Sequence, residues 1–315
     1  MGAIAQLIQR QHARLANRVC LDLAGDNAVL LSGSGRSGTS WLANLCNYQN
    51  GFRYIFEPLN PDLLAADDAV TQWCPSLDEE CPMVRKMLRG EISMPWVNSR
   101  NGRLIARRRL IKEIRSNLML PWINHHFPMV KTVLIIRNPL AVAASRKMLN
   151  SLADGSRWVW KPSLERLLAE PMLADQISNR QFTALSRQVG QGIVMETIAD
   201  WCLNNLVATS NLSWQQTYPI FYEDLVSKPE TSLRALFEFL DIEYRADVMV
   251  IHQRRSETSR SQPLSNDQPS DNPPQWQTIL DCGEVSTATE LLNLLGLDRL
   301  YSGDWQPCLQ PAARD

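Results

Sequence analysis

The chain has 315 residues, of which 44% are hydrophobic and 21% are charged, so it is long enough to bury a large core. The formal net charge of −1 excludes the broad basic field that nucleic-acid binders use, and we expect no nucleic-acid partner. The sequence contains no signal-peptide core and no apolar run of membrane-spanning length. We therefore expect a cytoplasmic protein without a transmembrane segment.

Seven cysteines are scattered along the chain without a C-x-x-C pair, and only four histidines accompany them. This usage gives no zinc-binding pattern, so we expect no metal site. Cys74 and Cys81 bracket a short segment and would be able to form a disulfide in a secreted protein. A reduced chain is the preferred interpretation.

The chain opens with residues 1–27, which predict a leading helix and then a turn. The helix is amphipathic, because Ile4, Ile8 and Leu15 recur at helical spacing. The apolar run 28–31 follows and predicts a buried strand.

A glycine-rich loop, SGSGRSGTSWL, spans residues 32–42 and leads into a predicted helix at 41–48. Gly33, Gly35 and Gly38 let the backbone turn tightly enough to point several N–H groups at one anion. The helix N-terminus adds partial positive charge at the same place. The loop predicts a phosphate site, and an ordinary Gly/Ser-rich turn before a helix is the alternative.

This loop differs from the P-loop of nucleotide hydrolases, G-x-x-x-x-G-K-[ST]. When Gly33 and Gly38 are aligned with the glycines of that pattern, Thr39 falls at the lysine position. The loop's positive charge is instead Arg36, which suits a 5′-phosphate group. Thr39 and Ser40 supply hydroxyl donors at the start of the helix.

The next predicted elements alternate between strands and helices. Residues 52–56 predict a strand closed by Glu57, and residues 110–114 predict another strand. Residues 119–127 predict a helix ahead of a strand at 133–136. Such alternation indicates a mostly parallel sheet flanked by helices, with ligands at the carboxyl ends of its strands.

The second functional pattern is TVLIIRNPLAVAAS, residues 132–145. Its strand ends in Arg137, where an ATPase would place an aspartate that holds magnesium. An arginine at this point suits a second phosphate, and Ser145 on the following helix can face the same anion. A strand-end arginine beside an ordinary helical serine is the alternative interpretation.

The C-terminal half continues the α/β pattern after an interruption. Residues 150–192 contain helix-like patches without a clear strand. We interpret them as a helical lid or acceptor-specificity segment, and a helical insertion packed on the core is the alternative. Residues 193–214 predict a long helix, and residues 218–222 predict a strand. The polar stretch 254–274 predicts a loop ordered by ligand, and residues 275–298 return to helix.

Together these segments resemble the sulfotransferase family that uses 3′-phosphoadenosine 5′-phosphosulfate (PAPS). R-S-G-T-S-W-L matches the family's 5′-phosphosulfate loop, and R-N-P-x-x-V-A-x-S matches its 3′-phosphate motif. Residues 221–225, FYEDL, followed by Pro229, match its Y-E-D-L segment. The resemblance covers residues 29–240. Arg36 in place of lysine, and the segment FEPL at 56–59, are closer to the bacterial and carbohydrate branches than to the cytosolic phenol branch.

The resemblance implies a three-layer α/β P-loop fold, with a central mostly parallel sheet flanked by helices and a helical lid. It implies a single sulfotransferase domain over residues 1–315. The implied reaction moves a sulfuryl group from PAPS to an acceptor hydroxyl and leaves adenosine 3′,5′-bisphosphate (PAP), without a metal. The acceptor stays open among saccharides, lipids, carrier-tethered alcohols and small molecules, with FEPL favouring a saccharide, and so does the oligomeric state.

The resemblance also implies the donor-binding residues. They belong to the loop, the strand-end motif, the Y-E-D-L segment and the polar loop: Gly35, Arg36, Ser37, Gly38, Thr39, Ser40, Trp41, Arg137, Ser145, Tyr222, Arg255 and Arg260. The family's usual C-terminal R-K-G signature is missing from the polar loop.

For catalysis, Arg36 is expected to stabilise the leaving phosphate and the sulfuryl oxygens. The candidates for the general base are, in order, Glu57, His125 with His126, and His252. Glu57 ends the strand after the loop helix and can face the donor, and its alternative role is an ion pair with Arg53 or Arg36.

Two other functions are weighed against this one. A nucleotide or sugar kinase is disfavoured by Thr39 at the lysine position and by the missing strand-end aspartate. A catalytically silent nucleotide-binding or scaffold protein is disfavoured by the intact set Arg36, Arg137 and Ser145, although that set would survive the loss of a catalytic base.

Overall fold

The structure is a computed structural model, and it describes residues 15–17, 19–62, 64, 75–151, 163–210, 215–253, 275–301 and 303–308. Arg255, Arg260 and the predicted loop 254–274 lie outside the described residues, as do Cys74 and residues 152–162 of the predicted lid. The other predicted site residues all lie within the described part of the chain.

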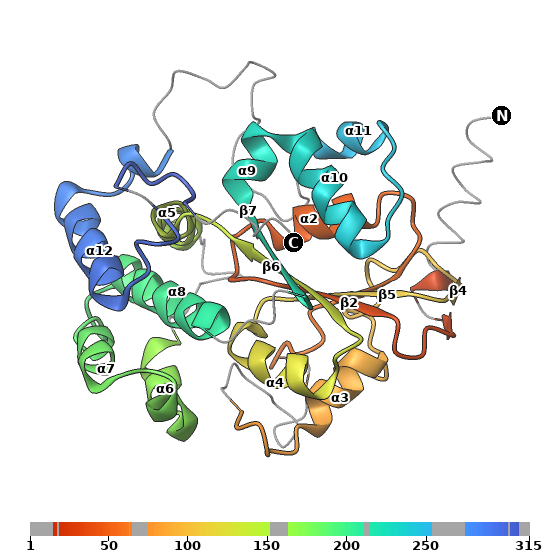
Figure 1. Ribbon diagram of the computed structural model, residues 1–315, viewed down its shortest axis with the longest axis horizontal. Coiled ribbons are helices and arrows are strands. Elements are labelled where there is room, and N and C mark those ends of the chain that lie inside the picture. Colours follow the sequence, from red (N-terminus) through yellow and green to blue (C-terminus); the bar gives the residue numbers. More distant parts are fainter. Residues whose placement is uncertain are drawn as a thin grey trace.

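A five-stranded, all-parallel sheet forms the centre of the molecule (Figure 1). Its strands, in spatial order, are β3 (Arg53–Phe56), β5 (Arg109–Glu113), β2 (Ala28–Ser32), β6 (Lys131–Ile136) and β7 (Thr217–Phe221). All but one of the strand residues are buried, and a parallel sheet of this kind requires helices on both faces. This confirms the predicted sheet.

Side chains of each strand alternate between two hydrophobic clusters, because successive residues of a strand point to opposite faces. In β2, Val29 and Leu31 belong to one cluster and Leu30 belongs to the other. In β6, Val133 and Leu134 divide in the same way. The sheet thus separates two cores.

Helices cover both faces of the sheet and complete three layers (Figure 1). One face carries α2 (Thr39–Cys46), α9 (Tyr222–Ser227), α10 (Pro229–Leu240) and α11 (Val248–His252). The other carries α3 (Pro82–Arg89), η2 (Asn117–Met119), α4 (Leu120–His126), α5 (Pro139–Ser151) and α8 (Ile193–Ser210). The predicted three-layer α/β fold is therefore confirmed.

The described part of the predicted lid is helical and consists of α6 (Leu164–Leu168), η3 (Pro171–Asp175) and α7 (Asn179–Ser186). Leu164, Leu167 and Leu185 are fully buried in the same core as α8. These contacts fit the alternative of an insertion packed on the core, and the lid assignment stays a prediction.

The helix predicted at 275–298 is divided into η4 (Gln275–Thr278) and α12 (Cys282–Leu295). A new helix begins at Cys282 because Asp281 caps it: its carboxylate accepts from the Glu284 amide at 2.8 Å, and the Glu284 carboxylate accepts from the Asp281 amide at 3.0 Å.

The predicted leading helix is wrong for residues 21–22, which come just before the predicted turn. Residues Leu21–Asp22 form a short strand, β1, that pairs in parallel with β4 (Ile105–Ala106) in a separate two-stranded sheet. The cause is tertiary, because the Asp22 carboxylate accepts from Arg53 at 2.6 Å and from Arg109 at 2.7 Å. These arginines begin β3 and β5, so β1 is held at the amino edge of the main sheet.

Candidate active site

The glycine-rich loop within residues 32–42, called the phosphate loop here after its predicted ligand, joins β2 to α2 at the carboxyl edge of the sheet. This is the position that the sequence predicted. Arg36 and Gly38 both adopt left-handed conformations, with φ of 77° and 88°. The Ser37 amide closes the turn by donating to the Ser34 carbonyl at 3.0 Å. Left-handed residues in such a turn direct neighbouring backbone amides toward one side, which is the geometry of an anion-binding concavity.

Two glycines of the loop are required by neighbouring elements. A β-carbon on Gly33 would lie 2.7 Å from the Ile135 carbonyl oxygen, and one on Gly38 would lie 2.7 Å from the Tyr222 ring. Both distances are shorter than van der Waals contact. The loop therefore packs directly against β6 and the start of α9.

We expect Gly38→Ala to destabilise the protein by about 1–3 kcal/mol, because alanine at φ 88° is strained and its methyl group meets the Tyr222 ring. Urea unfolding measures this loss. Gly51→Ala is the matched control, since nothing lies within 4 Å of its added carbon. Equal unfolding free energies for the two variants would contradict the close approach.

The two predicted phosphate motifs meet at the carboxyl edge. Arg36 Nε donates to Ser145 Oγ at 3.0 Å, and Arg137 Nη1 donates to the Arg36 carbonyl oxygen at 2.9 Å. The loop after β2 and the loop after β6 therefore share one set of contacts, although Arg36 and Arg137 are 101 residues apart in the chain.

The electrostatics of this edge favour an anion. Burial lowers the pKa of Arg36, and the positive charge of Arg137 lowers it further. Two buried atoms nearby, Ser34 Oγ and Arg137 Nε, have no hydrogen-bond partner among the described residues. Buried polar atoms without a partner are uncommon, and an anionic ligand would satisfy both. The hydrogen-bond donors at this edge therefore fit phosphate groups.

The loop that carries Arg137 is held from several elements. Trp201 Nε1 donates to the Arg137 carbonyl oxygen at 2.9 Å, and the Asn138 amide donates to the Glu223 carboxylate at 3.0 Å. The Tyr222 ring lies under the Arg137 guanidinium, 4.3 Å from ring centroid to Cζ. Tyr222 and Glu223 of the Y-E-D-L segment thus support the arginine of the second motif.

Arg146 also supports the phosphate loop, and the sequence analysis missed it. It is fully buried, forms an ion pair with Asp200 at 3.1 Å and donates to the Gly35 carbonyl oxygen at 3.2 Å. Burial lowers its pKa to about 10. The sequence pointed to Arg146 only through its position directly after Ser145. Its partner Asp200 lies on α8, and this pairing is known only from the structure.

Glu57 lies at the carboxyl end of β3, in a left-handed conformation with φ of 44°. Its carboxylate forms an ion pair with Lys112 and a longer one with Arg115, at 3.7 Å. The expected alternative partner Arg53 instead binds Asp22 at the amino edge. Lys112 and Arg115 are further residues at this edge to which the sequence analysis assigned no role.

Glu113 holds this part of the edge in shape. Its fully buried carboxylate accepts from the Leu59 amide at 2.8 Å, the Ile114 amide at 2.9 Å and Arg115 Nη1 at 3.1 Å. The segments after β3 and β5 are therefore tied together. Glu57 and Arg115 face each other because of this tie.

Trp41 lies in an aromatic cluster behind the loop. Its ring centroid is 5.4 Å from that of Tyr222 and 5.0 Å from that of His252, and its Nε1 donates to the His252 carbonyl oxygen at 3.2 Å. The other end of His252 is occupied, since Nε2 lies 2.8 Å from the Leu225 carbonyl oxygen. His252 therefore connects α2, α9 and α11 as a packing residue.

The structure does not bring His125 or His126 to the phosphate loop. Both end α4, directly before β6, whose first residue Lys131 pairs with Val29 near the start of β2. They thus lie at the amino edge, while the loop lies at the carboxyl edge. His126 stacks on Trp122 at 4.3 Å, and burial together with Arg85 lowers its pKa. A base at this position would act far from the donor.

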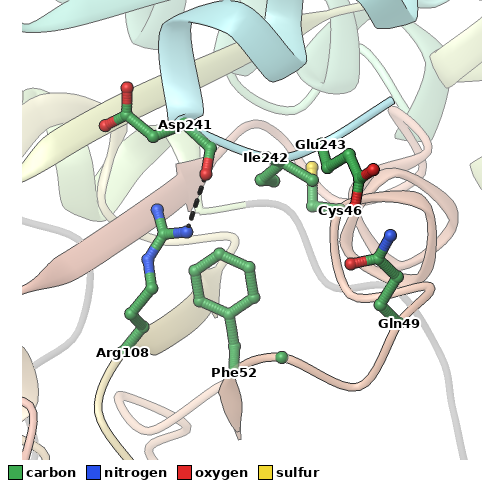
Figure 2. Close-up of a pocket in the computed structure, with 8 residues that line it drawn as sticks. Cys46, Gln49, Phe52, Arg108, Asp241, Ile242 and Glu243 are labelled. Carbon is green, nitrogen blue, oxygen red and sulfur yellow. Dashed lines mark hydrogen bonds between the residues drawn. The ribbon is translucent and has the colours of Figure 1, made fainter. Parts of the chain in front are cut away.

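A shallow pocket of about 140 Å³ lies at the amino edge (Figure 2). Arg108 stands over the Phe52 ring and donates to the Leu240 and Asp241 carbonyl oxygens, at 2.5 and 3.0 Å. Its guanidinium therefore caps the end of α10, and the pocket is separate from the phosphate loop.

Three remaining expectations concern metals, disulfides and membranes. Among the described residues, no group of three or more His, Cys, Asp or Glu side chains is placed to hold a metal ion. Cys81 is a free, buried thiol. Within the same residues, no helix combines the length and the apolar character needed to cross a bilayer.

Solved structures that align with this protein include several sulfotransferases. The structure of mouse sulfotransferase SULT7A1 complexed with PAP aligns with a TM-score of 0.48 and 14% identity, over 91% of this chain and 88% of that one. A sulfotransferase from Alicyclobacillus acidocaldarius aligns at 0.41 and 13%, over 85% and 95%. The sulfotransferase domain of the Synechococcus PCC 7002 olefin synthase aligns at 0.41 and 15%, over 84% and 94%.

A comparison with curated proteins finds no match. A model of the sulfotransferase family matches residues 28–246, which is more than half of the chain and includes both phosphate motifs and Glu57. The chain therefore belongs to the sulfotransferase family.

Proposed function

We propose that this protein transfers the sulfuryl group of PAPS to a hydroxyl group of its acceptor and releases PAP. The observation that carries the proposal is the contact between the two phosphate motifs. Arg36, Arg137 and Ser145 come from three places in the chain and meet at one edge of the sheet. This arrangement supplies two cations and a hydroxyl to a ligand with phosphates at both ends.

The loop and the second motif would hold different ends of the donor. The amides of the loop and Arg36 would hold the 5′-phosphosulfate, with Thr39 and Ser40 at the helix start supplying hydroxyl donors. Arg137 and Ser145 would hold the 3′-phosphate. Tyr222 packs against Trp41, and these two residues would line the end of the site near the adenine.

The remaining residues at the edge would act on the acceptor. Glu57 directly follows β3, which is separated from β2 by β5, so about 10 Å lies between the strand that precedes the base and the strand that precedes the loop. An acceptor hydroxyl would lie over β5 between them. Its oxygen would form a bond to sulfur while the bond from sulfur to the 5′-phosphate oxygen breaks, and its proton would pass to the Glu57 carboxylate.

Lys112 and Arg115 would hold the Glu57 carboxylate in position before the acceptor enters. Both contact its carboxylate, and Lys112 is almost fully buried. As the proton arrives, Glu57 becomes neutral, and the Lys112 ammonium group is released to stabilise negative charge on the sulfuryl oxygens. Catalysis of this kind depends mainly on positioning and fixed charges.

Calorimetry tests the donor directly. We expect PAP to bind without added metal and ATP with Mg²⁺ to bind more weakly, because the strand-end residue is Arg137 rather than an aspartate and the lysine position is Thr39. Tighter binding of ATP with Mg²⁺ would support a kinase instead. Transfer of labelled sulfate from PAPS to a panel of saccharide, lipid and small-molecule alcohols then identifies the acceptor and excludes a silent binding protein.

We expect Arg137→Ala to weaken PAP binding by about 10–100-fold, because charge-assisted hydrogen bonds contribute roughly 1.5–3 kcal/mol. AMP lacks the 3′-phosphate, so its affinity should change little. The exposed Arg187→Ala is the control variant. An equal loss for PAP and AMP would show that Arg137 does not bind the 3′-phosphate.

A further inference from the structure

The two-stranded sheet β1–β4 has one face turned to solvent, at the edge of the molecule (Figure 1). Its two strands run in parallel, with Leu21 opposite Ile105 and hydrogen bonds from the Leu21 and Leu23 amides to the neighbouring strand at 2.7 and 2.8 Å. Alternate residues therefore share this outer face, defined here as Val19, Leu21, Leu23, Arg103, Ile105 and Arg107.

The outer face is unusually apolar for an exposed surface. Val19 is 61% exposed, Leu21 56%, Leu23 53% and Ile105 53%. Leu15, at the start of the described chain, is also half exposed. Single exposed apolar residues are ordinary, but four along two short adjacent segments form a patch, and such patches mark interaction sites.

The charge on the outer face is positive. Arg103 and Arg107 are exposed and flank Ile105 along β4. The one acidic side chain of β1, Asp22, points to the inner side, where it forms ion pairs with Arg53 and Arg109. The outer face therefore presents an apolar centre with a cation at each end.

In the sequence, residues 1–21 contain Arg10, Arg14 and Arg18 and no acidic residue. The outer face by itself combines exposed apolar side chains with two arginines. This is the combination that binds the interface of an anionic bilayer.

We propose that the outer face of β1–β4 docks on an anionic lipid surface. A second copy of the chain fits less well, because a twofold contact through this face would bring the arginines of both copies together. The preceding segment of the same chain fits less well for the same reason, since its charges are also positive. This proposal does not depend on the proposed sulfuryl transfer, because the outer face lies at the amino edge, away from the phosphate loop.

The test measures sedimentation of the full chain with two kinds of vesicle. One kind is pure phosphatidylcholine, and the other is an equimolar mixture of phosphatidylcholine and phosphatidylserine. We expect binding to the anionic vesicles that weakens as salt is added, because surface charge is screened. The triple variant Leu21→Gln, Leu23→Gln, Ile105→Gln should bind them at least about tenfold more weakly.

The double variant Arg103→Gln, Arg107→Gln should lose about fivefold in affinity per arginine on anionic vesicles and nothing on neutral ones. The control variant is Val226→Gln, Val250→Gln, whose side chains are 53% and 52% exposed on other helices. It should bind like the unmodified chain.

Failure of the unmodified chain to bind anionic vesicles would overturn the proposal, as would a triple variant that binds like the control. A dimer that the triple variant converts to a monomer in analytical ultracentrifugation would instead assign the face to a second copy. An unchanged midpoint of urea unfolding in each variant shows that the fold is intact. If the triple variant is unfolded, the single variant Leu21→Gln replaces it, and we expect it to bind anionic vesicles more weakly than the control does.

Discussion

Replacing Glu57 with glutamine is expected to lower the rate of sulfuryl transfer by about 10²–10⁴-fold, the usual contribution of a positioned base. Glutamine keeps the shape of the side chain but cannot accept the acceptor proton. The affinity for PAP should change little, because in the proposed binding mode the loop after β2 and Arg137 would hold the donor. Steady-state kinetics with saturating PAPS, together with calorimetry, measure the two quantities separately.

Two further variants separate the base from the ion pair. Glu57→Asp retains a carboxylate near Lys112 and should keep more activity than Glu57→Gln. Glu230→Gln, on the exposed surface of α10, is the matched control and should be fully active. If Glu57→Gln lost PAP affinity and stability but kept its turnover rate, Glu57 would be a structural residue of the Lys112 and Arg115 pair.

Arg36→Ala is expected to lower kcat/KM by about 10²–10³-fold, which is the cost of removing one preorganised donor from a developing negative charge. The variant also loses the hydrogen bond to Ser145, so PAP affinity should fall as well. Transfer assays with labelled sulfate and calorimetry with PAP check both effects.

Arg36→Lys tests whether charge alone is sufficient. Lysine retains the positive charge but lacks the Nε–H that Arg36 directs at Ser145, so we expect intermediate activity. The backbone does not distinguish these variants, because residue 36 has φ of 77° and arginine, alanine and lysine are all strained there to a similar degree. Equal activities of Arg36→Ala and the unmodified chain would remove Arg36 from the catalytic site.

The glycine loop and the strand-end arginine were predictable because their signals are local. A strand, a tight turn and a helix start follow one another between Ala28 and Cys46, and the left-handed conformation of Gly38, with φ of 88°, favours glycine. The run that forms β6 ends at Ile136, so the position of Arg137 at the carboxyl edge also follows from a local pattern.

The environment of the candidate base was not predictable in the same way. Glu57 was expected to pair with Arg53 or Arg36, but its carboxylate contacts Lys112 and Arg115. Arg53 is only four residues away along a strand and points to the opposite edge. The pairing partner belongs to β5, and the sequence does not state which strand lies beside β3.

Arg146, His125 and His126 also show that a local sequence pattern does not tell where a side chain lies in the fold. Arg146 follows Ser145 directly but is not one of the motif's own residues, yet its contacts with Asp200 and the Gly35 carbonyl oxygen place it under the loop. His125 and His126 carried the chemical signal of a base, yet their position before β6 places them at the amino edge. The residue type determines the chemistry that a side chain can perform. The order of the strands and helices determines whether that side chain lies near the phosphate loop.

The sequence by itself determined the fold class, the parallel sheet, the phosphate loop and the arginine that follows β6. Each depends on side-chain periodicity or on backbone conformation within about a dozen residues. Only the tertiary structure decided the strand order, the partners of Glu57, the role of Arg146 and the exposed face of β1–β4. These depend on contacts between residues dozens of positions apart, and burial fixes such contacts only after the sheet has assembled.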